Sequence, residues 1–401
     1  MARHYSTKHF FRQMSNALLA RYFHERGLFV EFDFAAMKEG KVDPLFEAWL
    51  QLPVAERNSM DTEFREIFEM SCEKGWKAIL DEANEQLRNS PDALKAFVVA
   101  CAALSNHYER AMCTFLDHHA FWRGATLFHH ADQLPYWRKR KNMLHQRAST
   151  DEQSLEQLAG VIRTYFHHTE GRGNNCVVEW FRRGEFDYFF AYPEDYSQQS
   201  IEWVNGEFDR RPHNPAFEIV FIYSQHDGSL DLNYRGAKQA VEPLQGMFAT
   251  AILKLKELPP NPDDTRVYDL APLLSKDFAF TPDPESGIEA VQVKKMRLSS
   301  RVRKGERVTL EADAVYETLD RLKLSLPLRV FNLTQVELVA SVRLDPLKPP
   351  KRVPIRITYP NSCSLKYDEM GLRLRDMLAA SGIELKEEEE QPLAELESMV
   401  A

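Results

Sequence analysis

Hydrophobic positions in the first part of the chain recur at spacings of three and four residues. This spacing places them on one face of an amphipathic helix. One helix is predicted by the stripe Phe64, Ile67, Phe68, Cys72, Trp76, Ile79, Leu80 and Ala83. Ser90-Pro91-Asp92 is typical of a helix start, and it predicts a second helix that runs to Trp122. A third helix is expected from Asp151 to His168.

After the polar loop 169–175 the hydrophobic period changes to two, as expected for strands with one buried side. Hairpins are predicted for 176–181 with 186–193, for 217–224 with 230–234, and around Lys304-Gly305. Strands near 328–344 and 352–359, with helices over 236–258 and 365–380, complete the predicted elements. Local hairpins beside separate blocks of helices favour an α+β fold with an antiparallel sheet.

The change of period also predicts the domain organisation. We expect an all-helical domain over residues 1–170, an antiparallel-sheet α+β domain over 174–383, and an acidic disordered tail over 384–401. The tail holds seven Glu and one Lys, and therefore −6 of the total formal charge of −9. The first 383 residues carry only −3, so the overall acidity does not exclude nucleic acid as a partner.

Composition places the chain among globular proteins. It is 44% hydrophobic and 11% aromatic, too apolar for a disordered chain. No secretory signal or membrane-spanning stretch is indicated, and the five cysteines are scattered without a CxxC pair. We therefore expect a cytoplasmic protein with no membrane partner. Because GxxxxGK[ST] and GxGxxG are both missing, we also expect no nucleotide cofactor.

A histidine-rich stretch, residues 113–145, raises the question of a metal site. Asp117-His118-His119 resembles the tripeptide after which one family of phosphoesterases is named. That family places it at a strand end with paired aspartates upstream, whereas here it lies on a predicted helix without an Asp-x-Asp pair. The histidines also occur as adjacent pairs and not at the i, i+4 spacing of metal ligands on a helix. We therefore predict no metal site, and a core-edge position for His118 or His119.

Two phosphodiesterase hypotheses remain as alternatives. HEPN-type ribonucleases use an Arg followed five positions later by a His on a helix. Arg140–His145 and Arg163–His168 resemble that pattern in their spacing. In that arrangement the histidine acts as acid or base and the arginine stabilises phosphate charge. Strand carboxylates are the second possibility, because a cluster of them holds Mg²⁺ for phosphodiester hydrolysis. The carboxylates in question are Glu179, Asp187, Glu218 and Asp231.

The strongest signal is the basic hairpin around Lys304-Gly305. Between residues 294 and 307 a single acid, Glu306, opposes seven basic residues, namely Lys294, Lys295, Arg297, Arg301, Arg303, Lys304 and Arg307. A ribbon with a net charge of +6 can lie along phosphates. Further basic patches are Arg138, Lys139, Arg140 and Lys141 beside Tyr136 and Trp137, and Lys348–Arg352 with Arg343 and Arg356.

Three interpretations of this hairpin stay open. It can bind DNA or RNA, or it can protect an edge strand from aggregation. The third option is a protein partner, because the acidic tail and the aromatic-rich first half both suit assembly into a larger complex. The sequence thus predicts a component without its own catalytic centre that binds nucleic acid or joins a larger complex. A phosphodiesterase is the competing class.

Overall fold

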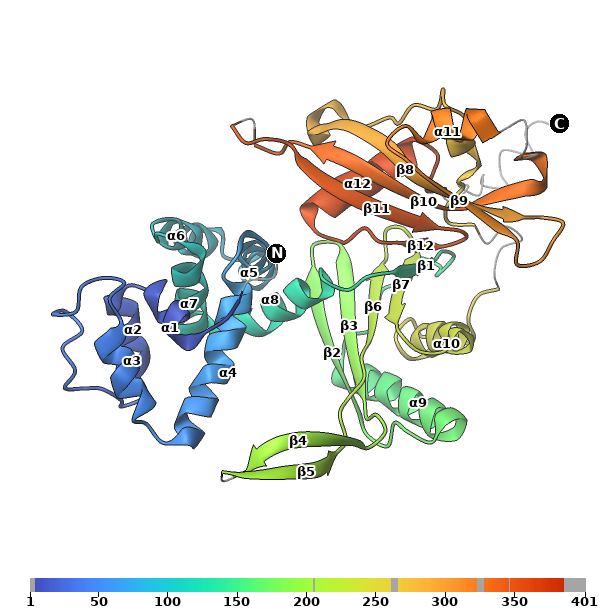
Figure 1. The fold of residues 1–401 in the computed structure, drawn as a ribbon. Helices are drawn as coiled ribbons and strands as arrows, with labels where there is room; N and C mark the ends of the chain where they lie inside the picture. Colours follow the sequence, from blue (N-terminus) through green and yellow to red (C-terminus); the bar gives the residue numbers. More distant parts are fainter. Residues whose placement is uncertain (1–3, 205, 261–265, 323–327, 346, 386–401) are drawn as a thin grey trace. The chain divides into compact units, whose positions relative to one another are not determined.

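Two groups of contacts divide the chain. The computed structural model describes residues 4–204, 206–260, 266–322, 328–345 and 347–385. One unit comprises Met1–Gln133 with Phe181–Gly184, and the other comprises Leu134–Trp180 with Glu185–Ala401. The first is helical and the second combines a large antiparallel sheet with helices, which confirms the α+β class (Figure 1). The predicted boundary at 169–175 lies inside the second unit. Residues 386–401, most of the predicted acidic tail, lie outside the described residues.

The first unit contains the first eight helices. They are α1 (Thr7–Arg12), α2 (Asn16–His24), α3 (Asp43–Leu50), α4 (Val54–Met70), α5 (Glu73–Gln86), α6 (Pro91–Ala102), α7 (His107–Asp117) and α8 (His119–Ala131). The helix expected over 64–83 is therefore broken in two, because extended Cys72 caps α5 with its Sγ. The helix expected to run to Trp122 is broken at Asn106, which caps α7 through its side chain, and again at His118. The hydrophobic residues keep their three- and four-residue spacing across these caps, so the sequence pattern did not reveal the breaks.

The described residues of the second unit contain twelve strands. They are β1 (Trp137–Arg140), β2 (Cys176–Arg183, whose end belongs to the first unit), β3 (Phe186–Pro193), β4 (Gln198–Val204), β5 (Glu207–His213), β6 (Ile219–Ser224), β7 (Ser229–Tyr234), β8 (Ile288–Ser300), β9 (Arg307–Glu311), β10 (Phe331–Val342), β11 (Lys351–Thr358) and β12 (Ser362–Cys363). Its helices are α9 (Glu152–Glu170), α10 (Val241–Ala251), α11 (Val315–Leu322) and α12 (Glu369–Ala380), with short 3₁₀ turns at Lys238–Ala240, Ala271–Leu274, Pro284–Ser286 and Leu328–Val330.

Ten strands form one sheet in the order β2-β3-β6-β7-β1-β12-β11-β10-β8-β9. All three predicted hairpins are present in it, and they pair antiparallel where their register is defined. The central strand β1 was not predicted. It pairs with β7 on one side and with β12 on the other, and it thereby joins the two halves of the sheet.

The two halves of the sheet bury opposite faces. Trp137 of β1 pairs with Cys363, which belongs to the core under α11 and α12. Arg138, the next residue, pairs with Leu232, which belongs to the core under α9 and α10. Successive strand residues point to opposite faces. The core under α9 and α10 therefore lies on the face opposite the core under α11 and α12. Strands β11, β10, β8 and β9 have one face that neither core covers, and we call it the helix-free face.

A separate ribbon is formed by β4 and β5 (Figure 1). Trp203 and Phe208 lie opposite each other on it, and they are 75% and 55% exposed. This ribbon was not predicted, because its strands are polar and neither strand has a row of buried side chains.

Candidate nucleic-acid interface

The basic tetrad 138–141 does not form a surface patch. Lys139 and Arg140 are buried, and Arg138 and Lys141 are half-buried. Arg138 donates to the backbone oxygen of Tyr234 at 3.1 Å, and Arg140 donates to that of Pro259 at 2.6 Å. Since Arg138, Lys139 and Arg140 lie on the central strand β1, their side chains alternate between the two faces of the sheet. The prediction that Lys139 and Arg140 bind nucleic acid at the surface was wrong.

Lys139 belongs to a buried charge cluster, which consists of Lys139, Arg375, Asp231 and Glu384. The Nζ of Lys139 lies 2.7 Å from Glu384 and 3.9 Å from Asp231. Burial opposes ionisation of Lys139, but the two carboxylates raise its pKa. Burial also opposes ionisation of Glu384, yet Lys139 and Arg375 hold the pKa of Glu384 below its ordinary value. Glu384 is therefore a fixed part of the fold, and the predicted tail cannot begin there.

Arg140 and His145 do not form a HEPN-like pair. Arg140 ends β1, and burial lowers the pKa of its guanidinium. His145 follows in a loop with a left-handed backbone (φ 49°), where its Nδ1 lies 3.0 Å from the backbone oxygens of Gln225 and His226. The helix that this chemistry requires is absent at 140–145. Arg163 and His168 do lie on α9, where Arg163 pairs with Glu156 at 3.4 Å.

The strand carboxylates do not converge on a metal. Asp187 is opposite Tyr223 on β6, whereas Asp231 is opposite Ile222, the neighbouring residue. They therefore lie on opposite faces of the sheet. Asp187 accepts from the Trp180 indole at 3.0 Å, and Asp231 accepts from Tyr367, which is also buried.

The remaining two carboxylates also offer no centre. Glu179 lies on β2 and Glu218 precedes β6, and both are half-buried. Among the described residues, no group of three His, Cys, Asp or Glu side chains is placed to hold a metal ion. Asp117 of the histidine-rich stretch is held by Arg21 at 2.7 Å, and the His118 ring packs against Phe97 and Phe121.

The basic hairpin forms as predicted, and its charges divide into three groups. Lys294 pairs with Asp313 at 3.2 Å and Lys295 pairs with Glu311 at 2.8 Å, two acids just beyond the basic segment. Arg297 and Arg307 project from β8 and β9. The exposed loop between these strands carries the other three cations, Arg301, Arg303 and Lys304. Counted to residue 313, seven basic residues oppose three acidic ones, so the net charge of the hairpin is +4.

Strand register shows which side chains share the helix-free face. Directly paired residues of antiparallel strands point to the same side. One row across the sheet contains Glu311, Lys295, Glu337 and Arg356. Its charges alternate and are neutralised within the row, because Arg356 also pairs with Glu337 at 2.7 Å. This compensated row has little free charge to offer a ligand.

The adjacent row on the same face contains no acid. It runs over six strands, β1, β12, β11, β10, β8 and β9, which at about 4.8 Å per strand corresponds to about 24 Å. We call it the polar row, and its members are Arg138, Ser362, Thr358, Gln335, Arg297 and Thr309. Only the three basic residues Arg138, Arg297 and neighbouring Arg307 were foreseen. The hydroxyl and amide members were missed, since their alignment depends on pairing between distant segments.

Arg297 is the electrostatic centre of the polar row. Its pKa is lowered by partial burial and by the nearby guanidinium groups of Arg307 and Arg356. Its Nε is buried and has no acceptor in the described part of the chain. Two like charges thus lie near the Arg297 guanidinium. An anion on this face would relieve the repulsion between these groups.

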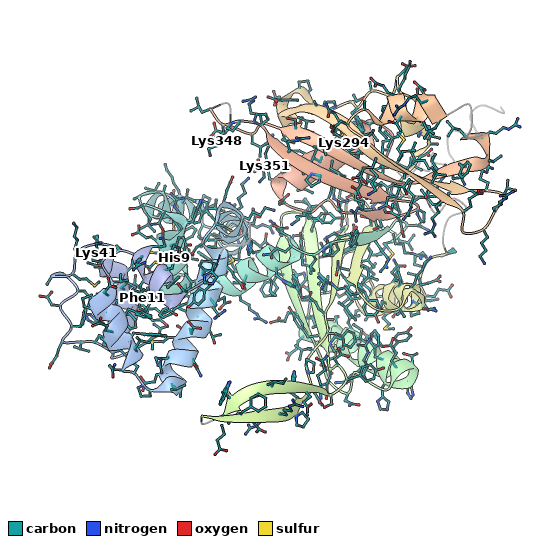
Figure 2. The ribbon with its side chains drawn as sticks, viewed as in Figure 1. His9, Phe11, Lys41, Lys294, Lys348 and Lys351 are labelled. Atoms are coloured by element: carbon teal, nitrogen blue, oxygen red, sulfur yellow. The ribbon has the colours of Figure 1, made fainter. Side chains whose placement is uncertain are left out.

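The third predicted patch lies at the far end of β10 and β11. Lys348 and Lys351 of this patch are labelled in Figure 2. Lys348 pairs with Asp345 at 3.4 Å, and Arg343 pairs with Glu289 at 2.5 Å. Lys351 and Arg352 are exposed. Arg352 pairs with Ser341 in the sheet register, on the same face as Arg356. This patch therefore adds one cation to the helix-free face.

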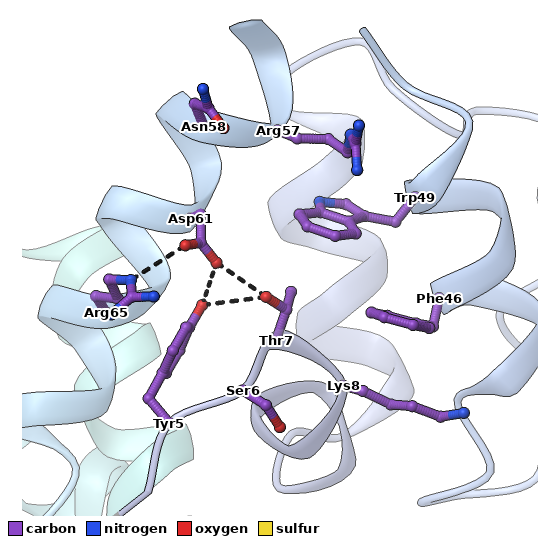
Figure 3. A pocket seen from close by; sticks show the side chains of 10 residues that line it. All are labelled: Tyr5, Ser6, Thr7, Lys8, Phe46, Trp49, Arg57, Asn58, Asp61 and Arg65. Atoms are coloured by element: carbon purple, nitrogen blue, oxygen red, sulfur yellow. Dashed lines mark hydrogen bonds and ion pairs between the residues drawn. The ribbon is translucent and has the colours of Figure 1, made fainter. Parts of the chain in front are cut away.

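A cavity of about 390 Å³ lies in the helical unit, between the start of α1 and helices α3 and α4 (Figure 3). Asp61 accepts hydrogen bonds from Tyr5 at 2.6 Å, Thr7 at 2.8 Å and Arg65 at 3.1 Å. Burial alone would raise the pKa of Asp61, but these donors lower it. Asp61 is thus an ionised acceptor committed to its own fold, and a poor general base.

Comparison with known proteins does not identify the chain. No protein family matches the sequence, and no curated protein is similar to it. Within the described ranges, no helix combines the length and apolar character needed to cross a bilayer.

Proposed function

We propose that this protein binds nucleic acid through the helix-free face of β8 to β12, and that it does so without a catalytic centre of its own. The observation that carries the proposal is the polar row, in which Arg297 lies beside Arg307 without an acid. Each phosphate that such a surface neutralises releases condensed counterions, which drives binding. The hydroxyls and amide of the row supply donors that position a phosphate backbone.

Edge protection explains these charges less well. A charge that protects an edge needs to lie on the edge strand, which here is β9. Arg297 lies on β8, and the row continues over the interior strands β10 and β11. The cations that do face acids, Lys294 and Lys295, are also those nearest the strand-to-helix connection. The uncompensated charge is therefore placed for a ligand and not only for the edge.

The proposal is tested by fluorescence anisotropy with labelled RNA, single-stranded DNA and duplex DNA between 50 and 300 mM salt, about the range over which phosphate contacts lose affinity. In the double variant Arg297→Gln with Arg307→Gln, affinity should fall about 10- to 100-fold. The slope of log K against log salt should become shallower by about 1.5, since two phosphate contacts are removed. Lys238→Gln with Lys276→Gln is the matched control, because it removes the same charge at two exposed positions outside the polar row.

Equal loss in both double variants would reduce the effect to overall charge and would contradict the proposal. Absence of binding at the lowest salt would also contradict it, and would leave a protein partner as the alternative. The same samples, incubated with Mg²⁺ and Mn²⁺, report on the phosphodiesterase hypothesis. Cleavage that survives Arg297→Gln would show that a separate catalytic site exists.

A further inference from the structure

An exposed aromatic ring adjoins the polar row. Tyr136 directly precedes β1 and is 49% exposed, although its neighbour Trp137 is fully buried. Arg356 donates to the Tyr136 hydroxyl at 2.5 Å and also donates to Glu337 at 2.8 Å, and its guanidinium carbon lies 5.7 Å from the centre of the tyrosine ring. Arg356, itself held by Glu337, thereby holds the ring on the helix-free face.

The backbone at Tyr136 is also unusual. Its φ of 63° lies in the left-handed region, which residues other than glycine and asparagine seldom adopt. Such strain persists only where the surrounding structure enforces it, and it is concentrated at functional sites. Here it turns a large aromatic side chain outward immediately before a buried strand, at a position where an exposed ring contributes nothing to the core.

The ring is close to the phosphate-binding donors. Tyr136 contacts Arg356, which lies two residues before Thr358 of the polar row on β11 and therefore on the same face. Arg138 begins the polar row. A single nucleotide whose base lies on Tyr136 therefore has a cation and the start of a donor row within the reach of its phosphate.

We infer that the helix-free face takes single-stranded nucleic acid in preference to duplex, with one base stacked on Tyr136 and the backbone following the polar row. This inference rests on the proposed function. Aromatic side chains stack on bases of any sequence when those bases are unpaired, whereas bases in a duplex are already stacked on each other.

Two substitutions separate the ring from its charge environment. Tyr136→Asn removes the ring and retains a residue that tolerates a left-handed backbone. Tyr136→Phe keeps the ring and removes only the hydroxyl. We expect a 20-nucleotide single strand to bind at least tenfold tighter than the matching duplex. Tyr136→Asn should weaken single-strand binding about 5- to 50-fold and leave duplex binding unchanged. Tyr136→Phe should change single-strand binding less than threefold.

A photo-crosslinking measurement on the unaltered protein guards against a variant that does not fold. A single strand containing 5-bromouracil is irradiated in the complex, and the modified peptide is identified by mass spectrometry. A crosslink at Tyr136 supports the inference, and crosslinks confined to other surfaces overturn it. Equal affinity for single strand and duplex, or no effect of Tyr136→Asn in folded protein, also overturns it. In those cases loss of affinity in the Arg297 and Arg307 double variant would still uphold the proposed function, so the two failures are distinguishable.

Discussion

The buried charge cluster and the polar row lie on strands of the same sheet, and they treat positive charge in opposite ways. Lys139 is enclosed, and Glu384 and Asp231 compensate its charge. Arg297 is half-exposed, and its near charged neighbours are two further arginines. Both residues come from basic runs that are similar in sequence. The role of a cation in this sheet therefore depends on the residues beside it on the same face. Those residues come from segments that are distant in the sequence.

The largest expected effect is on the compensated side of this comparison. Lys139→Met removes the cation and leaves Glu384 and Asp231 buried beside Arg375 alone. We expect the free energy of unfolding to fall by about 3–5 kcal/mol, since breaking a buried ion pair strands the remaining charge. Urea denaturation followed by circular dichroism measures it.

The double variant Lys139→Met with Glu384→Met serves as the control. Replacing both partners by apolar side chains removes the stranded charge, so at least half of the lost stability should return. A single variant within 1 kcal/mol of the unaltered protein would show that Lys139 is not an essential counter-charge, and would weaken the contrast with Arg297.

A buried carboxyl without a cation gives the second comparison. Glu82 of α5 lies against α8 where Gly124 allows close approach, and it accepts only from Gln86, at 2.8 Å, in the described part of the chain. Burial raises the pKa of Glu82 to about 7, in contrast to Glu384. The folded state therefore binds this proton more tightly than the unfolded state, and stability is lost as pH rises from 4.5 through about 7.

Glu82→Gln should remove this dependence, because a neutral amide has no proton to lose. At pH 8 we expect the variant to be about 2–3 kcal/mol more stable than the unaltered protein, and at pH 4.5 about equally stable. Urea denaturation at pH 4.5, 6, 7 and 8 provides the measurement. A difference that is the same at every pH would refute the assignment.

The smallest effects compare two neighbouring cations on the helix-free face. Arg297→Gln relieves repulsion from Arg307 and Arg356, so it should raise stability by about 0.5 kcal/mol or leave it unchanged while reducing nucleic-acid affinity. Lys295→Gln should change affinity less than twofold, because Glu311 already neutralises Lys295. Thermal melts and anisotropy on both single variants provide the measurements. Equal losses of affinity would contradict the distinction between the compensated row and the polar row.

Local pattern was sufficient for much of the fold. The α+β class, the three hairpins and the helix beginning after Asp151 were predicted, because a period of two or 3.6 and a capping side chain are local properties. β1 was missed because four basic or aromatic residues show no alternation. The breaks at Cys72 and Asn106 were missed because the hydrophobic stripe continues on the following helix.

The site was less accessible to prediction. The density of positive charge located the hairpin, but Lys294 and Lys295 pair with acids that follow the basic segment 294–307. The tetrad at 138–141 was misinterpreted because burial of a central strand is a tertiary property. Thr309, Gln335, Thr358 and Ser362 carry no local signal, and only the register of four separate strand pairings aligns them.

The strand β1 has a consequence for how this unit unfolds. This four-residue strand lies between two hydrophobic cores on opposite faces, and it is hydrogen-bonded to both halves of the sheet. Loss of either core would expose one side of β1 and leave the edge of the other half unpaired. The two halves should therefore melt in one cooperative transition, and a fragment that carries either half alone would be prone to aggregation and not an independent folding unit.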